Sequence, residues 1–525
     1  MTFGIKLASI IATAGLVAGL GIGAGVAAAD VTPASLFTDH MVLQRGMATP
    51  VWGTAAAGEK VTVSVAGKTE STIAGGDGKW MVRLNNLEAG GPHELTLAGN
   101  NSITFKDVYI GEVWLASGQS NMDFTVANTP KYYFAGVDNE AAEIAAANYP
   151  KIRMFTGQTS KKYTPQTSID GEWKVCNPEN VREMSAVGYF FARDLQKSID
   201  VPVGIVTMTF GASTAEAWIR REALEPIPEM KAELDKLDIA YRAVDDAAKK
   251  KYEEARAAWE VEAAKAKAAG EKAPRGPRNP DPAQDQHKPT VMFNGMIAPA
   301  IPYGIKGVIW YQGESVAGGP AGIKLYPQVQ AALVNDWRKL WNNPELPFYI
   351  VQLSSQKARS NNPDIRAAQA TILSLLNTGM AVTIDIGNPT NVHPKNKQDV
   401  GARLARIALA KAYGQAIEYS GPAYEKMSIE GQGVEGQRVR VRFTHATDGL
   451  VAKDSTSGEL KWFEIAGSDG KFVPAEAKID GDSVVVSSPT VPEPTAVRYA
   501  WHEWPEGANL FNKTGLPAAP FTSVK

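Results

Sequence analysis

The stretch "GEVWLASGQSNMDF", residues Gly111–Phe124, joins a hydrophobic segment to a run of small and amide residues. The segment 112–117 predicts a buried strand, and Ser120 follows it on a turn that Gly118 makes tight. A serine on a strand-to-helix turn presents its hydroxyl at the sheet edge, where backbone N–H groups can hold an anion. Ser120 is therefore a candidate nucleophile, although serine also caps helices in this position and the GxSxG signature is absent.

Strands and helices alternate on the C-terminal side of this turn, which is typical of a parallel sheet covered on both faces. Hydrophobic runs that end in polar or glycine residues predict strands at 201–211, 304–315, 346–355 and 379–387. Apolar residues at three-and-four spacing predict helices at 185–199, 326–341, 365–376 and 396–414. In open α/β sheets the ligand site lies beyond the carboxyl ends of the strands, so we expect the polar strand ends to converge there.

Different patterns flank this α/β core, which we assign to residues 108–415. Residues 30–107 and 416–525 alternate apolar and polar residues between turn signals, and each predicts a β-sandwich-like module. Residues 226–290 interrupt the core with an amphipathic, charged helical insertion and a Pro-rich return. The apolar spacing inside the insertion runs without interruption from Leu234 to Tyr252, which indicates one helix.

The first 29 residues read as a signal peptide, because Lys6 precedes an apolar run that ends in small residues before Asp30. We therefore expect export to the periplasm or outside the cell, without a membrane anchor after cleavage. The 54 basic and 56 acidic residues leave a formal net charge of −2. A net charge this close to zero creates no overall electrostatic field that would attract nucleic acid or an anionic membrane surface.

One histidine stands out as a base for the serine. His393 lies on a loop after the last core strand, directly before a proline and a helix, so it can face Ser120 across the sheet edge. The chain's histidines are widely spaced, which makes a zinc site improbable: they are His40, His93, His287, His393, His445 and His502. The single cysteine, Cys176, excludes an internal disulfide and suits a small buried side chain.

The group that would orient the imidazole is ambiguous. Asp385 lies eight positions before His393, and the position two before it is Asn391, which carries no charge. Asp385 or a backbone carbonyl could therefore support the ring.

Two residues at strand ends could stabilise an oxyanion. Gly211 offers an unobstructed backbone N–H, and Gln312 offers a side-chain amide. Glu314 could position loops or lie at the surface, and a glycosidase pair of Glu314 with Asp385 is possible by residue type alone.

Four motifs in order, "GEVWLASGQSNM", "FGASTAEAWI", "IKGVIWYQGES" and "HPKNKQDVGARLA", resemble conserved blocks of the bacterial sialate O-acetylesterases in the SGNH hydrolase superfamily. The resemblance covers nearly the whole chain after residue 29. It implies a flavodoxin-like α/β/α core, hydrolysis of O-acetyl esters on sugars through an acetyl-enzyme, and no metal or organic cofactor.

Position by position, the resemblance implies Ser120 as nucleophile and His393 as base. It implies an oxyanion hole made by the N–H groups of Ser120 and Gly211 with the Gln312 amide. Many family members carry aspartate two residues before the histidine, where this chain has Asn391. A Ser-His dyad therefore stays open.

The family resemblance indicates which reaction is catalysed, the hydrolysis of O-acetyl esters, more closely than it indicates which sugar carries the ester. Sialic acid and an acetylated plant or algal polysaccharide such as xylan or pectin are both open, as is an inactive carbohydrate-binding protein. A sialic acid site needs a cation for the substrate carboxylate, for which Arg153, Arg220 and Arg359 are candidates. Gln119 and Asn121 are expected to brace the serine loop.

Overall fold

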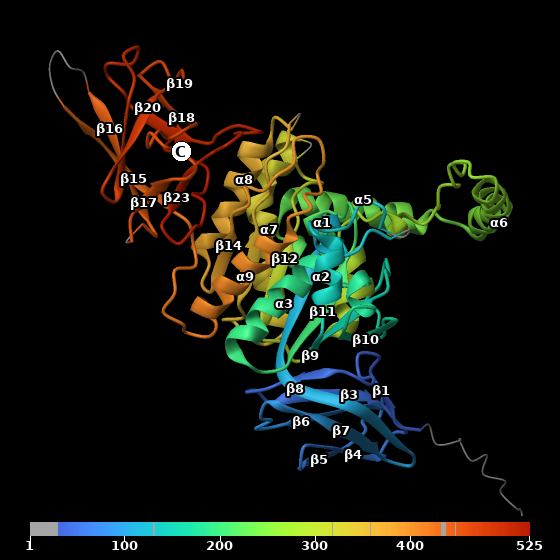
Figure 1. Ribbon diagram of the computed structural model, residues 1–525. Coiled ribbons are helices and arrows are strands. Elements are labelled where there is room, and N and C mark those ends of the chain that lie inside the picture. The colour runs from blue at the N-terminus through green and yellow to red at the C-terminus, as the bar shows by residue number, and fades with distance from the viewer. Residues whose placement is uncertain are drawn as a thin grey trace, which may run out of the picture.

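A computed structural model describes residues 30–129, 132–317, 319–357, 359–431, 437–446 and 448–524. The expected signal peptide, residues 1–29, lies outside these ranges. Figure 1 shows a small β module at the N-terminal end, an α/β core in the middle and a second β module at the C-terminal end. The predicted α/β/α core with a parallel sheet and two flanking β modules is confirmed.

The core sheet has the order β10-β9-β11-β8-β12-β13-β14, and all neighbours are parallel except β10 and β9. Its strands are β8 (Ser102–Gly118), β9 (Tyr149–Gly157), β10 (Gly171–Cys176), β11 (Val203–Thr209), β12 (Gly307–Tyr311), β13 (Phe348–Val351) and β14 (Thr378–Ala381). Every residue of β11, β12, β13 and β14 is buried, as expected for a parallel sheet covered on both faces. The strands β9 and β10 were not predicted, because their apolar runs are short and interrupted by charged residues.

Large aromatic residues pack between the helices and both faces of this sheet. On one face, Trp114 of β8 packs edge-on against Phe191, with ring centroids 5.1 Å apart. On the other face, Trp310 of β12 packs edge-on against Trp337 at 6.0 Å. The first face is covered by α3 and α9, and the second by α7 with α4 and α8. The three layers of Figure 1 therefore share one hydrophobic core.

The predicted core helices are present, but α7 begins at residue 320 instead of 326 and α8 ends at residue 370 instead of 376. The helices are α1 (Ser120–Asp123), α2 (Glu140–Ala146), α3 (Ala186–Ile199), α4 (Arg221–Leu224), α5 (Pro228–Arg242), α6 (Asp246–Ala268), α7 (Pro320–Leu340), α8 (Asn362–Ala370) and α9 (Lys397–Lys411). Short 3₁₀ or π turns lie at Asn180–Glu183, Ala215–Trp218, Pro282–Gln284, Phe293–Ile297, Ala298–Ala300 and Thr371–Ser374. Ser185 and Asn396 cap α3 and α9, because their side chains accept backbone hydrogen bonds at the helix starts.

The N-terminal β module shares a strand with the core. The first half of β8 pairs with β7, and its second half pairs with β11 and β12. The module's strands are β1 (Thr32–Pro33), β2 (Val42–Gln44), β3 (Thr49–Thr54), β4 (Lys60–Val65), β5 (Lys68–Ile73), β6 (Lys79–Leu84) and β7 (Gly90–Ala98). The buried side chains of this module and of the α/β core form one continuous cluster.

The C-terminal β module has a hydrophobic core of its own. It contains two four-stranded sheets, β15-β16-β21-β20 and β19-β18-β22-β24, and the pair β17-β23. Its strands are β15 (Ala423–Glu430), β16 (Arg438–Thr444), β17 (Leu450–Ala452), β18 (Phe463–Ala466), β19 (Val473–Pro474), β20 (Glu476–Asp480), β21 (Ser483–Ser487), β22 (Ala496–Tyr499), β23 (Leu510–Asn512) and β24 (Phe521–Thr522).

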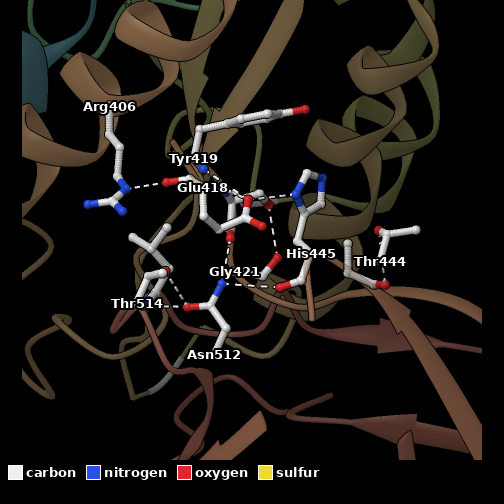
Figure 2. A network of polar contacts seen from close by, with 11 residues as sticks. Arg406, Glu418, Tyr419, Gly421, Thr444, His445, Asn512 and Thr514 are labelled. Atoms are coloured by element: carbon white, nitrogen blue, oxygen red, sulfur yellow. Dashed lines mark hydrogen bonds and ion pairs between the residues drawn. The ribbon is translucent and has the colours of Figure 1, made fainter. Parts of the chain in front are cut away.

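A polar network lies where this module begins, and Figure 2 shows Arg406 of α9 joining it to the core by donating to the Glu418 carbonyl. The Glu418 carboxylate lies 2.7 Å from His445 Nδ1 and accepts backbone N–H bonds from Tyr419 and Ser420. The Asn512 amide donates to the carbonyls of Ser420 and His445 at 2.8 and 3.2 Å. Burial alone would raise the pKa of Glu418, but these hydrogen bonds lower it.

The helical insertion corrects one prediction. The single helix expected from Leu234 to Tyr252 is broken into α5 and α6, because the Asp245 side chain accepts the Ala248 N–H and starts a new helix. No described residue of α6 is buried, and Figure 1 shows α6 projecting away from the core. Across the described residues, no helix is both long and apolar enough to cross a membrane.

Candidate active site

The serine turn is built on a glycine that no other residue could replace without strain. Gly118 ends β8 with φ +134°, and a Cβ there would lie 2.2 Å from the Tyr311 carbonyl oxygen of the neighbouring strand. The next residue, Gln119, donates its N–H to the same carbonyl at 2.9 Å. The Gln119 side chain accepts weak hydrogen bonds from the N–H groups of Gly313 and Ser315, both at 3.4 Å. The turn after the central strand is thereby tied to the turn after β12, with Ser120 as the first residue of α1.

His393 faces this serine from the loop between β14 and α9. Its Nε2 lies 2.9 Å from Ser120 Oγ, within hydrogen-bond reach. The Phe134 ring lies against the imidazole, with centroids 4.5 Å apart and planes tilted by 30°. Burial, with the positive charges of Lys397 and Arg359, lowers the pKa of His393 to about 4. The imidazole is therefore neutral near pH 7 and can accept a proton at Nε2.

The residues considered for orienting His393 do not bind its ring. Asn391 accepts the backbone N–H of His393 at 2.9 Å, so it shapes the loop. Asp385 forms a bidentate pair with Arg403, with both contacts at 2.7 Å. Among the residues that the structure describes, none forms a hydrogen bond with His393 Nδ1. The geometry is a Ser-His dyad supported through the backbone.

The two strand-end residues considered for the oxyanion behave differently. Gly211 lies beside Ser120, since a Cβ on Gly211 would be 3.7 Å from Ser120 Cβ. No described group accepts a hydrogen bond from the Gly211 N–H. Gln312 is fully buried; its amide donates to the Ser213 carbonyl at 3.3 Å, and its oxygen accepts from Tyr326 at 3.0 Å. One N–H of the Gln312 amide is therefore bound within the protein, and its second N–H forms no hydrogen bond with the described residues.

A buried amide links the serine turn to the histidine loop. Asn121 follows the serine, and its Nδ2 donates to the Glu314 carboxylate and, at 3.0 Å, to the carbonyl of Val392, which precedes the histidine. Asn121 Oδ1 accepts from Lys397 Nζ at 2.6 Å. An ammonium only donates, so Lys397 forces the Asn121 oxygen toward itself and the NH₂ toward the other two partners.

The charged members of this network are held in an apolar setting. Lys397 is fully buried, with its ammonium 4.6 Å from the centre of the Phe124 ring. Burial lowers the pKa of Lys397 to about 7, although the Glu314 carboxylate opposes this shift. Burial raises the pKa of Glu314, against the hydrogen bond from Asn121. Glu314 Oε2 is buried and has no hydrogen-bond partner among the described residues.

Only one of the three candidate arginines lies at the site. Arg153 pairs with Asp107, with Nη2 3.1 Å from Oδ2, and Arg220 pairs with Asp336. Arg359 donates to the backbone carbonyl of Glu314 at 3.1 Å and pairs with no carboxylate among the described residues. Its charge contributes to the low pKa of the site histidine, which places it near the reacting groups.

Metal-ligating side chains and the cysteine are further candidates for chemistry. Within the described part of the chain, no group of three or more His, Cys, Asp or Glu side chains could hold a metal ion. Cys176 is fully buried, and burial raises the pKa of its thiol to about 12. A thiolate nucleophile is therefore not available at neutral pH.

Sequence reasoning missed Lys397 and Phe134. Lys397 lies at helical spacing with Val400, Gly401 and Leu404, all of which face the core, so the periodicity could have indicated its burial. No sequence signal connects Phe134 with His393, because the two are brought together only by the fold.

A serine at the turn after the central strand of an α/β/α sheet, within hydrogen-bond distance of a histidine, is the arrangement of an SGNH-type serine hydrolase. Residues 287–410 match the family model "Carbohydrate esterase, sialic acid-specific acetylesterase". The chain is 36% identical to a carbohydrate acetylesterase from Xanthomonas citri, with a TM-score of 0.78 over 94% of this chain and 99% of that one.

Curated mammalian proteins are also similar over almost their whole length. Sialate O-acetylesterase of Rattus norvegicus is 28% identical, and the similarity covers 93% of this chain and 94% of the rat protein. The Homo sapiens protein of the same name is 28% identical, and the similarity covers 93% of this chain and 91% of the human protein. The chain belongs to the sialate O-acetylesterase family of SGNH-type carbohydrate esterases.

Proposed function

We propose that the protein removes O-acetyl groups from sugars by way of a serine-bound acetyl-enzyme. The observation that carries the proposal is the 2.9 Å contact between Ser120 Oγ and His393 Nε2. A neutral imidazole at this distance can take the hydroxyl proton as the oxygen attacks the acetyl carbonyl. This contact also argues against a protein that only binds carbohydrate.

In the proposed first step, Ser120 Oγ bonds to the acetyl carbon while its proton passes to His393. We assign the backbone N–H groups of Ser120 and Gly211 and the side-chain amide of Gln312 as donors to the developing oxyanion, because that amide uses only one of its two N–H groups on the Ser213 carbonyl. Each donor of this kind contributes about 3 kcal/mol to the transition state. His393 then protonates the leaving sugar oxygen, and water activated by the same imidazole releases acetate.

Replacing the serine tests this function. We expect Ser120→Ala to release no acetate from a chromogenic acetate ester or an O-acetylated sugar, with an unchanged circular dichroism spectrum. Ser198→Ala, on the exposed side of α3, is the matched control and should behave as wild type. Acetate release by the Ser120 variant at the wild-type rate would refute the proposal.

Arg359 favours a sugar that carries a carboxylate, such as sialic acid, over a neutral polysaccharide. A guanidinium near the base without an acidic partner can bind a substrate carboxylate. We expect Arg359→Gln to raise KM for O-acetylated sialic acid about tenfold or more while changing KM for acetylated xylan little. Higher wild-type kcat/KM on acetylated xylan or pectin would instead assign a plant or algal polysaccharide.

We also propose that the protein is exported, on the apolar segment before Asp30 alone. Sequencing the N-terminus of the protein recovered outside the cytoplasm tests this, with cleavage after Ala29 as the expected result.

A further inference from the structure

Beside the base, the segment 132–137 carries three successive aromatic residues, and one of them is left almost fully in solvent. Tyr133 is 79% exposed, more than any other large apolar side chain among the described residues. Its neighbours Tyr132 and Phe134 are only partly exposed. An exposed ring of this size, next to catalytic groups, is typical of a ligand contact.

The exposed ring of Tyr133 contacts Phe134, and Phe134 in turn contacts the histidine. The Phe134 ring lies against His393 with centroids 4.5 Å apart and a tilt of 30°, and Tyr133 contacts Phe134 edge-on, with centroids 5.8 Å apart at 87°. Phe134 is itself fastened by Phe124 at 6.2 Å. Tyr133 therefore contacts the ring that itself lies against the base.

Backbone contacts, and not burial of the ring, hold Tyr133 in place. Asn128 Nδ2 donates to the Tyr133 carbonyl at 3.0 Å. The two sides of the loop are joined by the hydrogen bond from Val137 N–H to the Val126 carbonyl at 3.0 Å. At Gly136, with φ +99°, a Cβ would lie 2.5 Å from the Glu140 carboxylate, so the turn requires glycine. These contacts hold the backbone beside the exposed ring.

Two other aromatic clusters in the described chain are occupied by contacts of their own. Tyr163 and Tyr241 stack on each other at 3.7 Å. Phe463, Tyr499 and Phe521 of the C-terminal module are buried in its core.

We propose that Tyr133, backed by Phe134, is the platform on which the pyranose ring of the substrate stacks, so that its acetyl group reaches Ser120. This inference rests on the proposed function and names a sugar-binding subsite for it. The C–H groups on one face of a pyranose carry partial positive charge and bind the negative face of an aromatic ring. Orienting the sugar in this way would favour one acetyl position over others.

Comparing a sugar ester with a ringless ester isolates the stacking contact. The substrates are an O-acetylated methyl pyranoside and ethyl acetate, and the variants are Tyr133→Ala, Tyr133→Phe and Tyr133→Trp. We expect Tyr133→Ala to lower kcat/KM for the pyranoside about tenfold more than for ethyl acetate, mainly through KM. Tyr133→Phe and Tyr133→Trp should keep most of the preference, because they keep the ring.

Tyr252→Ala, on the projecting α6, is the matched tyrosine control and should resemble wild type on both esters. An equal loss on both esters by Tyr133→Ala would overturn the platform and assign the tyrosine a structural role. Loss in Tyr133→Phe equal to that in Tyr133→Ala would also overturn it, because the hydroxyl would then carry the effect.

Sugar binding can also be measured without turnover. In a Ser120→Ala background, calorimetric titration with the acetylated pyranoside should give a dissociation constant about tenfold weaker when Tyr133 is also alanine. Equal affinities overturn the platform even if the chain proves to be an active esterase. If the wild type releases no acetate but the affinity difference is still observed, the proposed esterase activity is refuted and the sugar platform is retained.

Discussion

His393 keeps its place against Ser120 although no described side chain binds its Nδ1. Three contacts replace the missing carboxylate. Asn391 accepts the histidine's backbone N–H, Asn121 holds the preceding carbonyl, and Phe134 covers the ring. The imidazole lies close to two cations and has no carboxylate bound to its ring, so its pKa stays low. The low pKa can be measured in the pH dependence of the reaction.

The pH dependence of the esterase should show an unusually low acidic limb. Burial, Lys397 and Arg359 lower the pKa of His393 to about 4, so the neutral base persists above that pH and is lost as pH falls through it. We expect kcat/KM for a chromogenic acetate to reach half its plateau near pH 4. An acidic limb near the ordinary histidine value of about 6.5 would contradict the burial of the imidazole.

Lys397 should matter through position and through charge. Replacing it with methionine frees the Asn121 amide to turn, which loosens the link between the serine turn and the histidine loop. We expect Lys397→Met to lower kcat up to about 100-fold with little change in KM. We also expect the acidic limb to move to higher pH, because Lys397, with a pKa of about 7, is charged throughout that limb.

The neighbouring exposed lysine provides the control for this variant. Lys395→Met should leave both kcat and the acidic limb as in wild type. A fall in kcat for Lys397→Met without any shift of the limb would show that the lysine acts only as structural support.

At the scale of elements, the starts of α3 and α9 were predicted because one local residue decides each, whereas the core strands β11, β12, β13 and β14 end two to six residues earlier than predicted. Ser185 and Asn396 are helix caps whose side chains bind the first-turn N–H groups. The break at Asp245 was missed, because the apolar spacing continues across it and a cap inside a periodic run is easily overlooked. Strand β8 was predicted only in part, because its first half belongs to the N-terminal module.

The turn between β8 and α1 should not tolerate a side chain. At Gly118, alanine would combine a positive φ with a Cβ 2.2 Å from the Tyr311 carbonyl oxygen. Strain of this kind costs about 1–3 kcal/mol, and moving the turn also displaces Ser120. We expect Gly118→Ala to lower the thermal midpoint by at least about 3 °C and to reduce kcat strongly. Gly76→Ala, which has open space around it, is the control, and equal midpoints for the two variants would contradict the expected strain.

At the scale of the whole molecule, the two β modules are attached in different ways. The N-terminal module continues the core through β8 and shares its hydrophobic cluster. The C-terminal module has a separate cluster and is held by polar contacts, including the network in Figure 2. One fully buried side chain, Arg366 of α8, reaches from the core to a loop of this module.

Removing this guanidinium should loosen the C-terminal module. Arg366 donates to the carbonyls of Leu353 and Ser354 in the core, at 3.0 and 2.9 Å. It also donates to the carbonyls of His502 and Glu503, at 2.9 and 3.2 Å. Unpaired buried carbonyls are costly, so we expect Arg366→Met to lose at least about 3 kcal/mol of stability. Faster limited proteolysis between the core and the module, with a lower thermal midpoint, would be the readout.

Two further variants separate charge from geometry. Arg366→Lys should also be unstable, because an ammonium has only three donors on a flexible stem. Arg278→Met, at an exposed arginine of the insertion, should be neutral. Wild-type proteolysis rates in Arg366→Met would show that the module is held by its other contacts.

The sequence by itself determined the alternation of strands and helices, the glycine-bound turn of Ser120 and the loop of His393. Periodicity, turn residues and caps act over a few neighbouring residues and can be read locally. Only the tertiary structure decided that Gln312 is bound by Ser213 and Tyr326, and that Asp385 is paired with Arg403. The same holds for Lys397, whose burial beneath the site depends on segments far apart in the chain. A polar side chain takes whichever partner the fold brings within about 3 Å, and a linear pattern carries no such distance.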